Sequence, residues 1–420
     1  MAPAEASLLE HLTQNRHSFD ILRLQWEVET ESVAPLFEAI RQNDTVRYVF
    51  FYDFFFQGLS MNERREFLKS IASLPKLESL VYISNSSRVK FPVCALAEVM
   101  CSCKELTTFE LHGPNLVGKR PDFNDFFHFL GQLPKLKTVK LLPVYFGSGS
   151  IDLDHLFSSL SRLESLEEVR ICLYCDKMSV LTSTGLRKVC RSESLKILDL
   201  RWPHLTDDHV TAISLELRDN LSLRELRIAG NDLFYSCYSL AEMIEVNEGI
   251  GILSLACKGL CNDDCCNALW KAFGSSPFLE EITLENTDTY RDHDTGTGES
   301  IGRMMADNSS IVTLRLYNMG INDDACYSMA NALRVNTTLR TLDMRKGNRC
   351  ITNEGFEALA HMLERNYTLH ELQTNARGSI RHQIEVCLKL NKSAKRLQAD
   401  LGADIKKGPT AGILLCGTCQ

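Results

Sequence analysis

The sequence predicts an α/β solenoid, built from about 12 repeats of roughly 29 residues that each supply one strand and one helix. Two observations lead to this fold class. Residues 223–233, LRELRIAGNDL, place apolar side chains at Leu223, Leu226 and Ile228 ahead of Asn231 and Leu233. The same apolar pattern then returns along most of the chain at nearly constant spacing. Return at one period is the sequence signature of a repeat protein.

The first apolar position of each match gives the period. These positions are Phe19, Val46, Leu77, Leu106, Leu136, Leu166, Leu195, Leu223, Ile250, Leu279, Ile311, Leu339 and Leu369. From residue 77 onward, the intervals between successive positions are 29, 30, 30, 29, 28, 27, 29, 32, 28 and 30 residues. The two N-terminal intervals are 27 and 31 residues. A period of this length leaves room for a whole helix after each strand.

Residues 223–233 fit L-x-x-L-x-L-x-x-N-x-L, the strand segment of a leucine-rich repeat. Its apolar positions are expected to point into the body of the solenoid. The residues between them, Arg224, Glu225 and Arg227, are expected to face solvent on the inner face of a parallel sheet. Most other repeats lack the asparagine, as at Pro203 and Gly347, so we expect their turns to be less uniform.

Local signals place the helices and turns. Thr206, Asn322 and Thr352 are side chains that cap helix N-termini, and each is followed by acidic residues in the expected first turn. An asparagine and a small hydroxyl residue precede several strands, at Asn220, Asn308, Asn336 and Asn366. We attribute this recurrence to the helix-to-strand turn and not to glycosylation.

The N-terminal repeats are aromatic. In the strand that begins at Val46, the repeat frame turns Val46, Val49 and Phe51 to the core and Tyr48, Phe50 and Tyr52 to the inner face. Either an N-terminal cap covers these rings or they form a patch that binds a partner. Four segments are expected: a cap helix over 1–18, the repeat domain over 19–378, a closing helix over 379–400 and a flexible tail over 401–420.

Composition excludes several classes of protein. The net charge of −8 disfavours a nucleic-acid binder, and the chain has no apolar run long enough for a transmembrane helix. Because the N-terminus lacks a secretory signal, we expect a cytoplasmic monomer with no membrane association. Its 16 cysteines are then expected to be reduced, with Cys190, Cys326 and Cys387 packing as small apolar side chains.

Residues able to carry catalysis or metal binding form no persuasive set. Cys416 and Cys419 form a C-x-x-C pair near the C-terminus, and Cys172 and Cys175 form another in an expected strand-to-helix loop. Two further clusters are Cys257, Cys261, Cys265 and Cys266, and the loop residues Asp288, Asp292, His293 and Asp294. Redox or metal chemistry is a minority interpretation of all of them. Phosphate-binding glycine motifs are absent, so we expect no enzyme activity, no cofactor and no metal.

The inner face of the sheet is the candidate binding surface. Its basic and acidic residues alternate, which favours a specific protein partner over a polyanion. Arginine and aromatic side chains carry much of the binding energy in protein interfaces. The candidate partner-binding residues are Arg170, Arg201, Trp202, Arg224, Arg227, Arg315, Tyr317 and Arg345. For any one of them, a plain solvated role is an equal alternative.

The chain resembles the ribonuclease-inhibitor-type leucine-rich repeat family. The residues that carry the resemblance include LRELRIAGNDL, VTLRLYNMGINDDACYSMANALRVNTTLRTLDM and ITNEGFEALAHMLERNYTLHEL, within residues 19–372. The segment IEVCLKLNKSAKRL is also similar to the closing element of leucine-rich repeat proteins of unicellular algae. The family resemblance implies a right-handed α/β horseshoe, with the parallel sheet on the concave face and helices on the convex face.

The same resemblance implies a non-enzymatic scaffold that binds a protein partner on the concave face. By analogy of fold, an alternative is regulation of a small GTPase or a cytoskeletal protein, since relatives include the activator of the Ran GTPase and the tropomodulins. A thiol-redox role of CGTC at the C-terminus is the third hypothesis.

Overall fold

The computed structural model describes residues 12, 20–25, 33–84, 89–146, 151–175, 182–201, 205–232, 236–258, 260, 263–287, 297–348 and 350–405. The chain divides into two compact units, residues 1–289 and 290–420, here called unit 1 and unit 2. In both, strands and helices alternate along the chain, so the α/β repeat architecture expected from the sequence is confirmed. The candidates Trp202, Asp288, Cys416 and Cys419 lie outside the described residues.

Unit 1 contains a parallel sheet in which each strand pairs with the strand of the next repeat. Its main strands are β1 (Ile21–Leu24), β2 (Tyr48–Tyr52), β3 (Ser79–Ile83), β5 (Thr108–His112), β7 (Thr138–Phe146), β8 (Glu168–Cys175), β9 (Ile197–Arg201), β10 (Glu225–Asp232), β11 (Ile252–Lys258) and β12 (Glu281–Asn286). The order in the sheet is the order in the sequence. This order arises because, after each helix, the next repeat places its strand beside the strand of the repeat before it.

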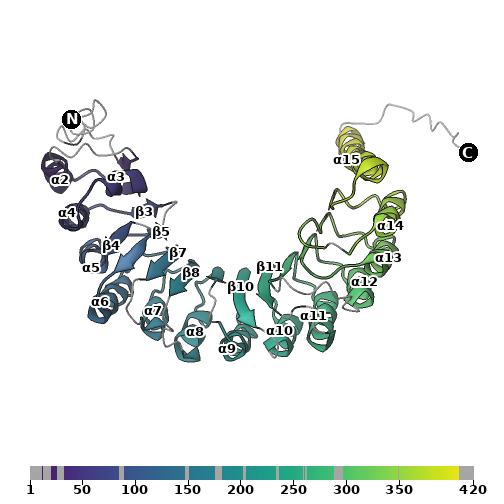
Figure 1. Cartoon of the computed structure of the whole chain (residues 1–420), viewed down its shortest axis with the longest axis horizontal. Helices are drawn as coiled ribbons and strands as arrows, with labels where there is room; N and C mark the ends of the chain where they lie inside the picture. Colours follow the sequence, from purple (N-terminus) through teal and green to yellow (C-terminus); the bar gives the residue numbers. More distant parts are fainter. Residues whose placement is uncertain are drawn as a thin grey trace, which may run out of the picture. The chain divides into compact units, whose positions relative to one another are not determined.

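The helices of unit 1 cover one face of this sheet and leave its inner face uncovered (Figure 1). They are α2 (Ala34–Arg41), α3 (Asp53–Gln57), α4 (Met61–Ala72), α5 (Val93–Ser102), α6 (Arg120–Leu130), α7 (Leu153–Leu160), α8 (Ser183–Cys190), α9 (Asp207–Leu217), α10 (Ser236–Val246) and α11 (Asp263–Ser275). From α4 onward each helix packs on the next one. The strand positions predicted to face the core, such as Leu226 and Ile228, are fully buried between sheet and helices.

The N-terminal rings divide as the repeat frame predicts. Val46, Val49 and Phe51 are fully buried, while Tyr48, Phe50 and Tyr52 are half-buried on the other face of β2. Phe51 lies in a cluster of buried rings whose other members are Phe55, Phe56, Phe67, Tyr82 and Phe91. Most of the aromatic run after β2 is therefore core, because α3 turns Phe55 and Phe56 inward.

A second short ribbon of parallel strands follows the repeat strands in part of unit 1. It pairs β4 (Lys90–Pro92) with β6 (Asn115–Val117), β6 with the end of β7, and the end of β7 with the end of β8. The register between β7 and β8 shifts between Leu141 and Val144, as at a β-bulge. Cys172 and Cys175 consequently lie in β8, and the expected strand-to-helix loop at this pair is wrong.

Buried and half-buried asparagines hold the helix-to-strand turns. Asn220 accepts hydrogen bonds at Oδ1 from the backbone N–H of Ser222 and Leu223, both at 2.9 Å, and donates from Nδ2 to Cys190 O at 2.8 Å in the preceding repeat. The same arrangement recurs at Asn247, Asn336 and Asn366. The turn role predicted for the N-x-[ST] sequences at Asn220, Asn336 and Asn366 is confirmed, and Asn247, which precedes Glu and Gly, forms the same turn without that motif. Each amide satisfies backbone groups of two successive repeats.

Unit 2 repeats the same plan. Its strands β13 (Thr313–Tyr317), β14 (Thr341–Asp343) and β15 (Glu371–Gln373) are parallel, and its helices are α12 (Thr297–Asp307), α13 (Asp323–Leu333), α14 (Asn353–Leu363) and α15 (Gly378–Ile405). The expected caps are present, since Asn322 accepts from Ala325 N at 2.9 Å and Thr352 from Glu354 N at 3.2 Å. Asn348, which the sequence reading did not identify, donates to Leu316 O at 2.8 Å.

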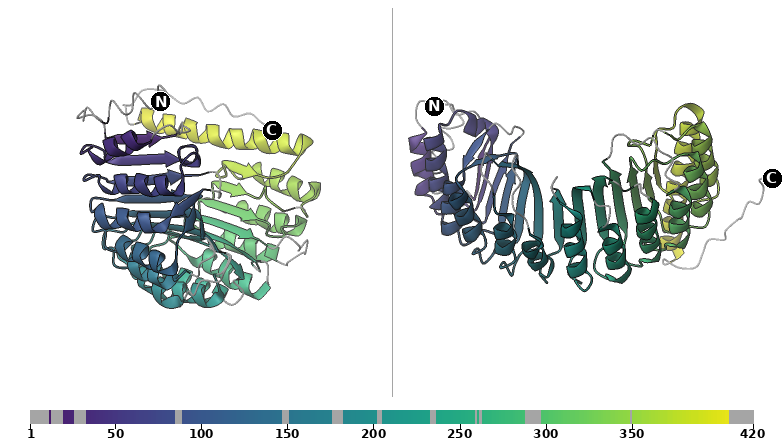
Figure 2. Two further views of the ribbon diagram at one scale, coloured as in Figure 1. Left: turned by 60° about the vertical axis from the view of Figure 1, so that its left-hand side comes forward. Right: turned by 60° about the horizontal axis from the view of Figure 1, so that its bottom comes forward.

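Helix α15 follows the last repeat strand of unit 2, β15. It packs against α14 (Figure 2) and runs from residue 378 to residue 405, into the range expected as tail. Its Asn391 is buried and donates to Asn366 O at 2.9 Å and Leu369 O at 2.7 Å, which extends the asparagine pattern into the helix. Across the described residues we find no helix with the length and apolar character needed to cross a membrane.

Candidate interaction surface on the inner face of unit 1

Strand register aligns charged side chains into one row across the face of the sheet that the helices leave uncovered. Neighbouring strands pair Glu110 of β5 with Lys140, Lys140 with Arg170, Arg170 with Asp199, and Asp199 with Arg227 of β10. Strands in a sheet lie about 4.8 Å apart, so each of these side chains is within reach of its neighbours. We call these five residues the charged row.

Asp199 is the buried centre of the charged row. Its side chain is fully buried, and Arg201 donates to its two oxygens from Nε at 3.0 Å and from Nη2 at 2.8 Å. Arg170 reaches the same carboxylate from Nη1 at 3.3 Å. The hydrogen bonds that Arg201 donates to Asp199 raise the pKa of Arg201. Two guanidinium groups thus neutralise one desolvated carboxylate, as a buried charge requires.

Glu168 of β8 and Glu225 of β10 complete this network; each lies two residues before the charged-row residue of its strand. Arg170 donates from Nε to Glu168 at 2.5 Å and contacts Glu225 at 3.1 Å, and Arg227 donates from Nε to Glu225 at 2.5 Å. Glu225, which the repeat pattern is expected to turn to solvent, is buried, and so is Asp199. The expectation for Glu225 was wrong because longer arginine side chains, Arg201 and Arg227 on the same strands and Arg170 on β8, cover these shorter carboxylates.

At the β5 end, Glu110 links Lys140 to a histidine. Glu110 lies 3.1 Å from Lys140 Nζ and 3.1 Å from His112 Nε2, and Lys140 also reaches Glu168 at 3.3 Å. The hydrogen bonds that Glu110 accepts from His112 and Lys140 outweigh burial and lower the pKa of Glu110. Together with Glu168, Glu225 and Arg201, the charged row therefore forms a continuous network from β5 to β10, with four basic and four acidic side chains.

A pair of tyrosines lies beyond this network, at the C-terminal ends of two strands. Tyr145 of β7 and Tyr174 of β8 stack with ring centroids 5.1 Å apart and planes 15° from parallel. Tyr174 is 48% exposed. Strand alternation places Tyr174 on the same face as Arg170 and Cys172, and Cys172 pairs in register with Arg201. Stacked tyrosines and Arg201 therefore lie at one edge of the charged row.

Sequence reasoning missed these tyrosines. Tyr145 follows a β-bulge in β7, beyond which the repeat frame no longer predicts which residues face inward, and Tyr174 of β8 is its partner in register. The alternation in LLPVYF and ICLYC was the available signal. Burial raises the pKa of the neighbouring Cys172, which disfavours a thiolate at this position.

The remaining candidates fall into separate places. Arg224 is exposed but precedes β10, and its Nη1 donates to Gly249 O of the next repeat at 2.9 Å. Arg340 makes the corresponding bond to Thr368 O at 2.9 Å, which indicates a role in stacking repeats. In unit 2, Tyr317 and Arg345 both donate to the buried Asp343, each at 2.9 Å, and Arg315 lies on β13. Unit 2 thus carries a smaller carboxylate-centred cluster of its own.

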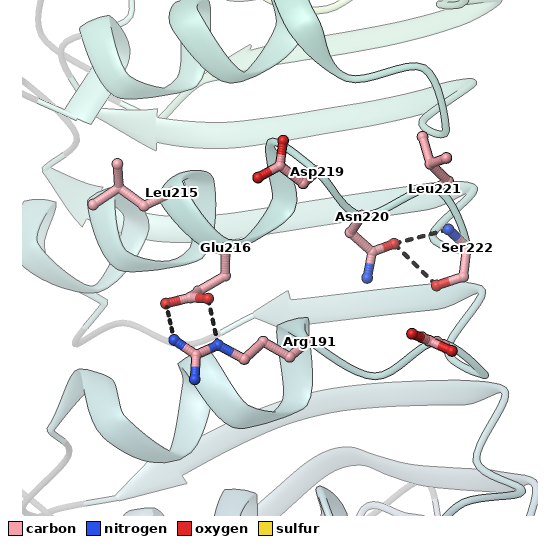
Figure 3. Close-up of a pocket in the computed structure, with 8 residues that line it drawn as sticks. Arg191, Leu215, Glu216, Asp219, Asn220, Leu221 and Ser222 are labelled. Carbon is pink, nitrogen blue, oxygen red and sulfur yellow. Dashed lines mark hydrogen bonds and ion pairs between the residues drawn. The ribbon is translucent and has the colours of Figure 1, made fainter.

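A surface depression of about 610 Å³ on the helix side of unit 1 is a second candidate site. Figure 3 shows that its polar side chains face one another: Arg191 donates to both oxygens of Glu216, and Asn220 accepts from Ser222. Leu215 and Leu221 complete the lining. Because these polar groups already hold the turn and the helix pair together, the depression offers less to a ligand than the inner face.

The other sequence clusters gain no support as metal or redox sites. Cys190 and Cys326 are buried as predicted, while Cys387 is only half-buried. Among the described side chains, no group of three histidine, cysteine or acidic residues is arranged to hold a metal ion. Most of the Cys257 and Asp288 clusters lies outside the described residues.

Comparison with known proteins identifies the repeat. The family model described as "Leucine Rich repeat" matches residues 335–360. The yeast Rad7 and Elc1 complex contains a chain that is 13% identical, with a TM-score of 0.43 and coverage of 87% of each chain. The tropomodulin C-terminal domain of Caenorhabditis elegans is 17% identical over 46% of this chain and 98% of its own length, with a TM-score of 0.30.

A third structure, leiomodin-1 actin-binding site 2, is 12% identical over 55% of this chain and 100% of its own length, with a TM-score of 0.25. The repeat period, the parallel strands with their packed helices and the family model matched over residues 335–360 together indicate a leucine-rich repeat fold.

Proposed function

We propose that this protein is a non-enzymatic scaffold that binds a protein partner on the inner face of the unit 1 sheet. Leucine-rich repeats are a protein-interaction architecture whose stacked strands form an extended binding surface. The ribonuclease-inhibitor-type subfamily, a cytoplasmic location and a monomeric state are parts of the same proposal. The partner-binding candidates of unit 2, Arg315, Tyr317 and Arg345, would contribute to a second contact.

The observation that carries the proposal is the position of Arg201 beside the Tyr145–Tyr174 stack. Arg201 is held by two hydrogen bonds to a buried carboxylate, so little side-chain freedom remains to be lost on binding. The two rings are fixed by stacking. Preorganised arginine and tyrosine side chains are the groups that most often dominate interface energies.

The experiment is capture of partners from a native lysate, followed by mass spectrometry. The intact chain is compared with Y174A/R201A and with the control Y238A/R218A, whose side chains lie on and beside the helices of unit 1. We expect a partner that the control retains and Y174A/R201A loses. A partner retained by both variants would reject the inner face as the binding surface. The identity of the partner also tests the alternative of a small GTPase or cytoskeletal protein.

A further inference from the structure

In each ion pair of the inner-face network, the cation is more exposed than its anion. Side-chain exposure is 50% for Arg201 against 0% for Asp199, and 30% for Arg227 against 11% for Glu225. The side chain of Lys140 is likewise more exposed than that of Glu110, at 23% against 18%. The physical reason is length: aspartate and glutamate stay near the sheet, and arginine and lysine extend above them. The network has as many acidic as basic side chains, but its solvent-exposed part is therefore more positive than negative.

The guanidinium groups retain donors for a second carboxylate. An arginine has five N–H donors, and a carboxylate accepts two of them in a parallel pair. Arg201 uses Nε and Nη2 on Asp199, and Arg227 uses Nε on Glu225. Within the described part of the chain, Nη1 of Arg201 and both terminal nitrogens of Arg227 have no other partner. These groups lie on neighbouring strands, and their side chains are more exposed than that of Arg170.

We propose that the segment of the partner protein bound on this face is acidic, with carboxylates that pair with Arg201 and Arg227 beside a group that packs on the Tyr145–Tyr174 stack. This inference rests on the proposed function and adds the chemistry of the partner. Electrostatic complementarity selects partners and orients their approach. The alternating order of charges in the sequence suggests no sign preference, whereas the exposed ends of the side chains favour an anionic partner.

The same surface disfavours nucleic acid. Polyanion binding requires many phosphate contacts across a basic surface, and the net charge of the chain is −8. The cationic ends are confined to a few side chains above buried carboxylates. Discrete carboxylates of a protein segment match this limited pattern, and a nearby ring or apolar group adds the contact that the tyrosines provide.

The test uses the full chain and two fluorescent probes, a copolymer of glutamate and tyrosine and a matched copolymer of lysine and tyrosine. Binding is measured by fluorescence anisotropy at low and physiological salt. We expect the acidic probe to bind, more tightly at low salt, and the basic probe to bind at least tenfold more weakly, a difference of about 1.4 kcal/mol. Equal or tighter binding of the basic probe would overturn the proposal, as would no binding of the acidic probe.

The deciding variant is D199N/R201Q. It removes one acid and one base, so the formal net charge stays at −8 while the exposed positive charge is lost. We expect roughly tenfold weaker binding of the acidic probe. The matched control is R191Q/E216Q, a two-bond ion pair on the helix side with the same net effect on charge. Equal affinity of D199N/R201Q and the intact chain would contradict the proposal.

Two further outcomes separate the acidic-partner inference from the proposed function. A lysate partner that depends on Tyr174 and Arg201, combined with failure of the acidic probe, would keep the scaffold function and reject the acidic chemistry. A DNA duplex that binds more tightly than the acidic probe and depends on Arg201 would instead assign the surface to nucleic acid. Circular dichroism of each variant confirms that loss of binding does not reflect unfolding.

Discussion

Arg201 holds both oxygens of Asp199, at 3.0 Å and 2.8 Å, and thereby neutralises a carboxylate that solvent does not reach. Removing Arg201 alone leaves this buried carboxylate with only the longer contact from Arg170, at 3.3 Å, whereas removing both members of the pair leaves no buried charge at this position. Arg201 consequently contributes both to the stability of the sheet and to the positive charge on its exposed surface.

The first prediction concerns this coupling. We expect R201Q to lower the free energy of unfolding by about 2–4 kcal/mol, and D199N/R201Q to lower it by less than R201Q alone. Urea denaturation of the two single variants and the double variant gives the coupling free energy. The R191Q/E216Q cycle, on a pair whose arginine is 64% exposed, should give about 1 kcal/mol or less. Strictly additive effects at Asp199 and Arg201 would contradict the prediction.

The second prediction concerns the turn asparagines. N366A removes bonds to Leu333 O and Asn336 O and from Thr368 N and Leu369 N, all in buried or half-buried positions. We expect a loss of about 2–4 kcal/mol, because unpaired buried backbone groups cost about 1–3 kcal/mol each.

The control for this substitution is N331A, on the exposed side of α13. It should change the free energy of unfolding by about 0.5 kcal/mol or less. Similar urea midpoints for N366A and N331A would show that the turn bonds are not needed for stability.

The third prediction is a pH dependence at Glu110. Its pKa is lowered in the folded chain, chiefly by the hydrogen bond it accepts from His112, from an ordinary value of 4.5. The folded state therefore binds fewer protons than the unfolded state near that pH, and stability rises with pH. The contribution of Glu110 is present above pH 4.5 and is lost as pH falls through the lower folded value.

Denaturation of the intact chain and of E110Q across this range measures that contribution. The difference in unfolding free energy between the two should shrink as the pH drops below 4.5. A difference that stays constant through the acid range would exclude the proposed ionic role of Glu110.

The fourth prediction separates the thiols by burial. Burial raises the pKa of Cys190 and of Cys326 to about 12, whereas Cys101 is exposed. Because the thiolate is the reactive form, brief alkylation of the folded protein should modify Cys101 and leave the two buried thiols intact. Peptide mass spectrometry reads the pattern, and urea should make all three react. Rapid labelling of Cys326 in the native protein would contradict the packing of α13.

The sequence by itself determined the repeat period and the direction of most strand side chains. Leu226, Ile228 and Phe51 are buried as the pattern predicts, because strand alternation is a local property that needs no knowledge of neighbouring repeats. The turn role of Asn366 followed in the same way, since the turn motif is contained within a few residues.

Only the tertiary structure decided which charges are exposed and where the tyrosines lie. Asp199 and Arg170 are adjacent because β8 and β9 pair in a register set by residues 29 positions apart. The bulge in β7 then shifts the local frame and brings Tyr145 beside Tyr174. Cross-strand pairing depends on how repeats stack, and the burial of each carboxylate depends on the arginine above it. A single sequence read repeat by repeat contains neither relation explicitly.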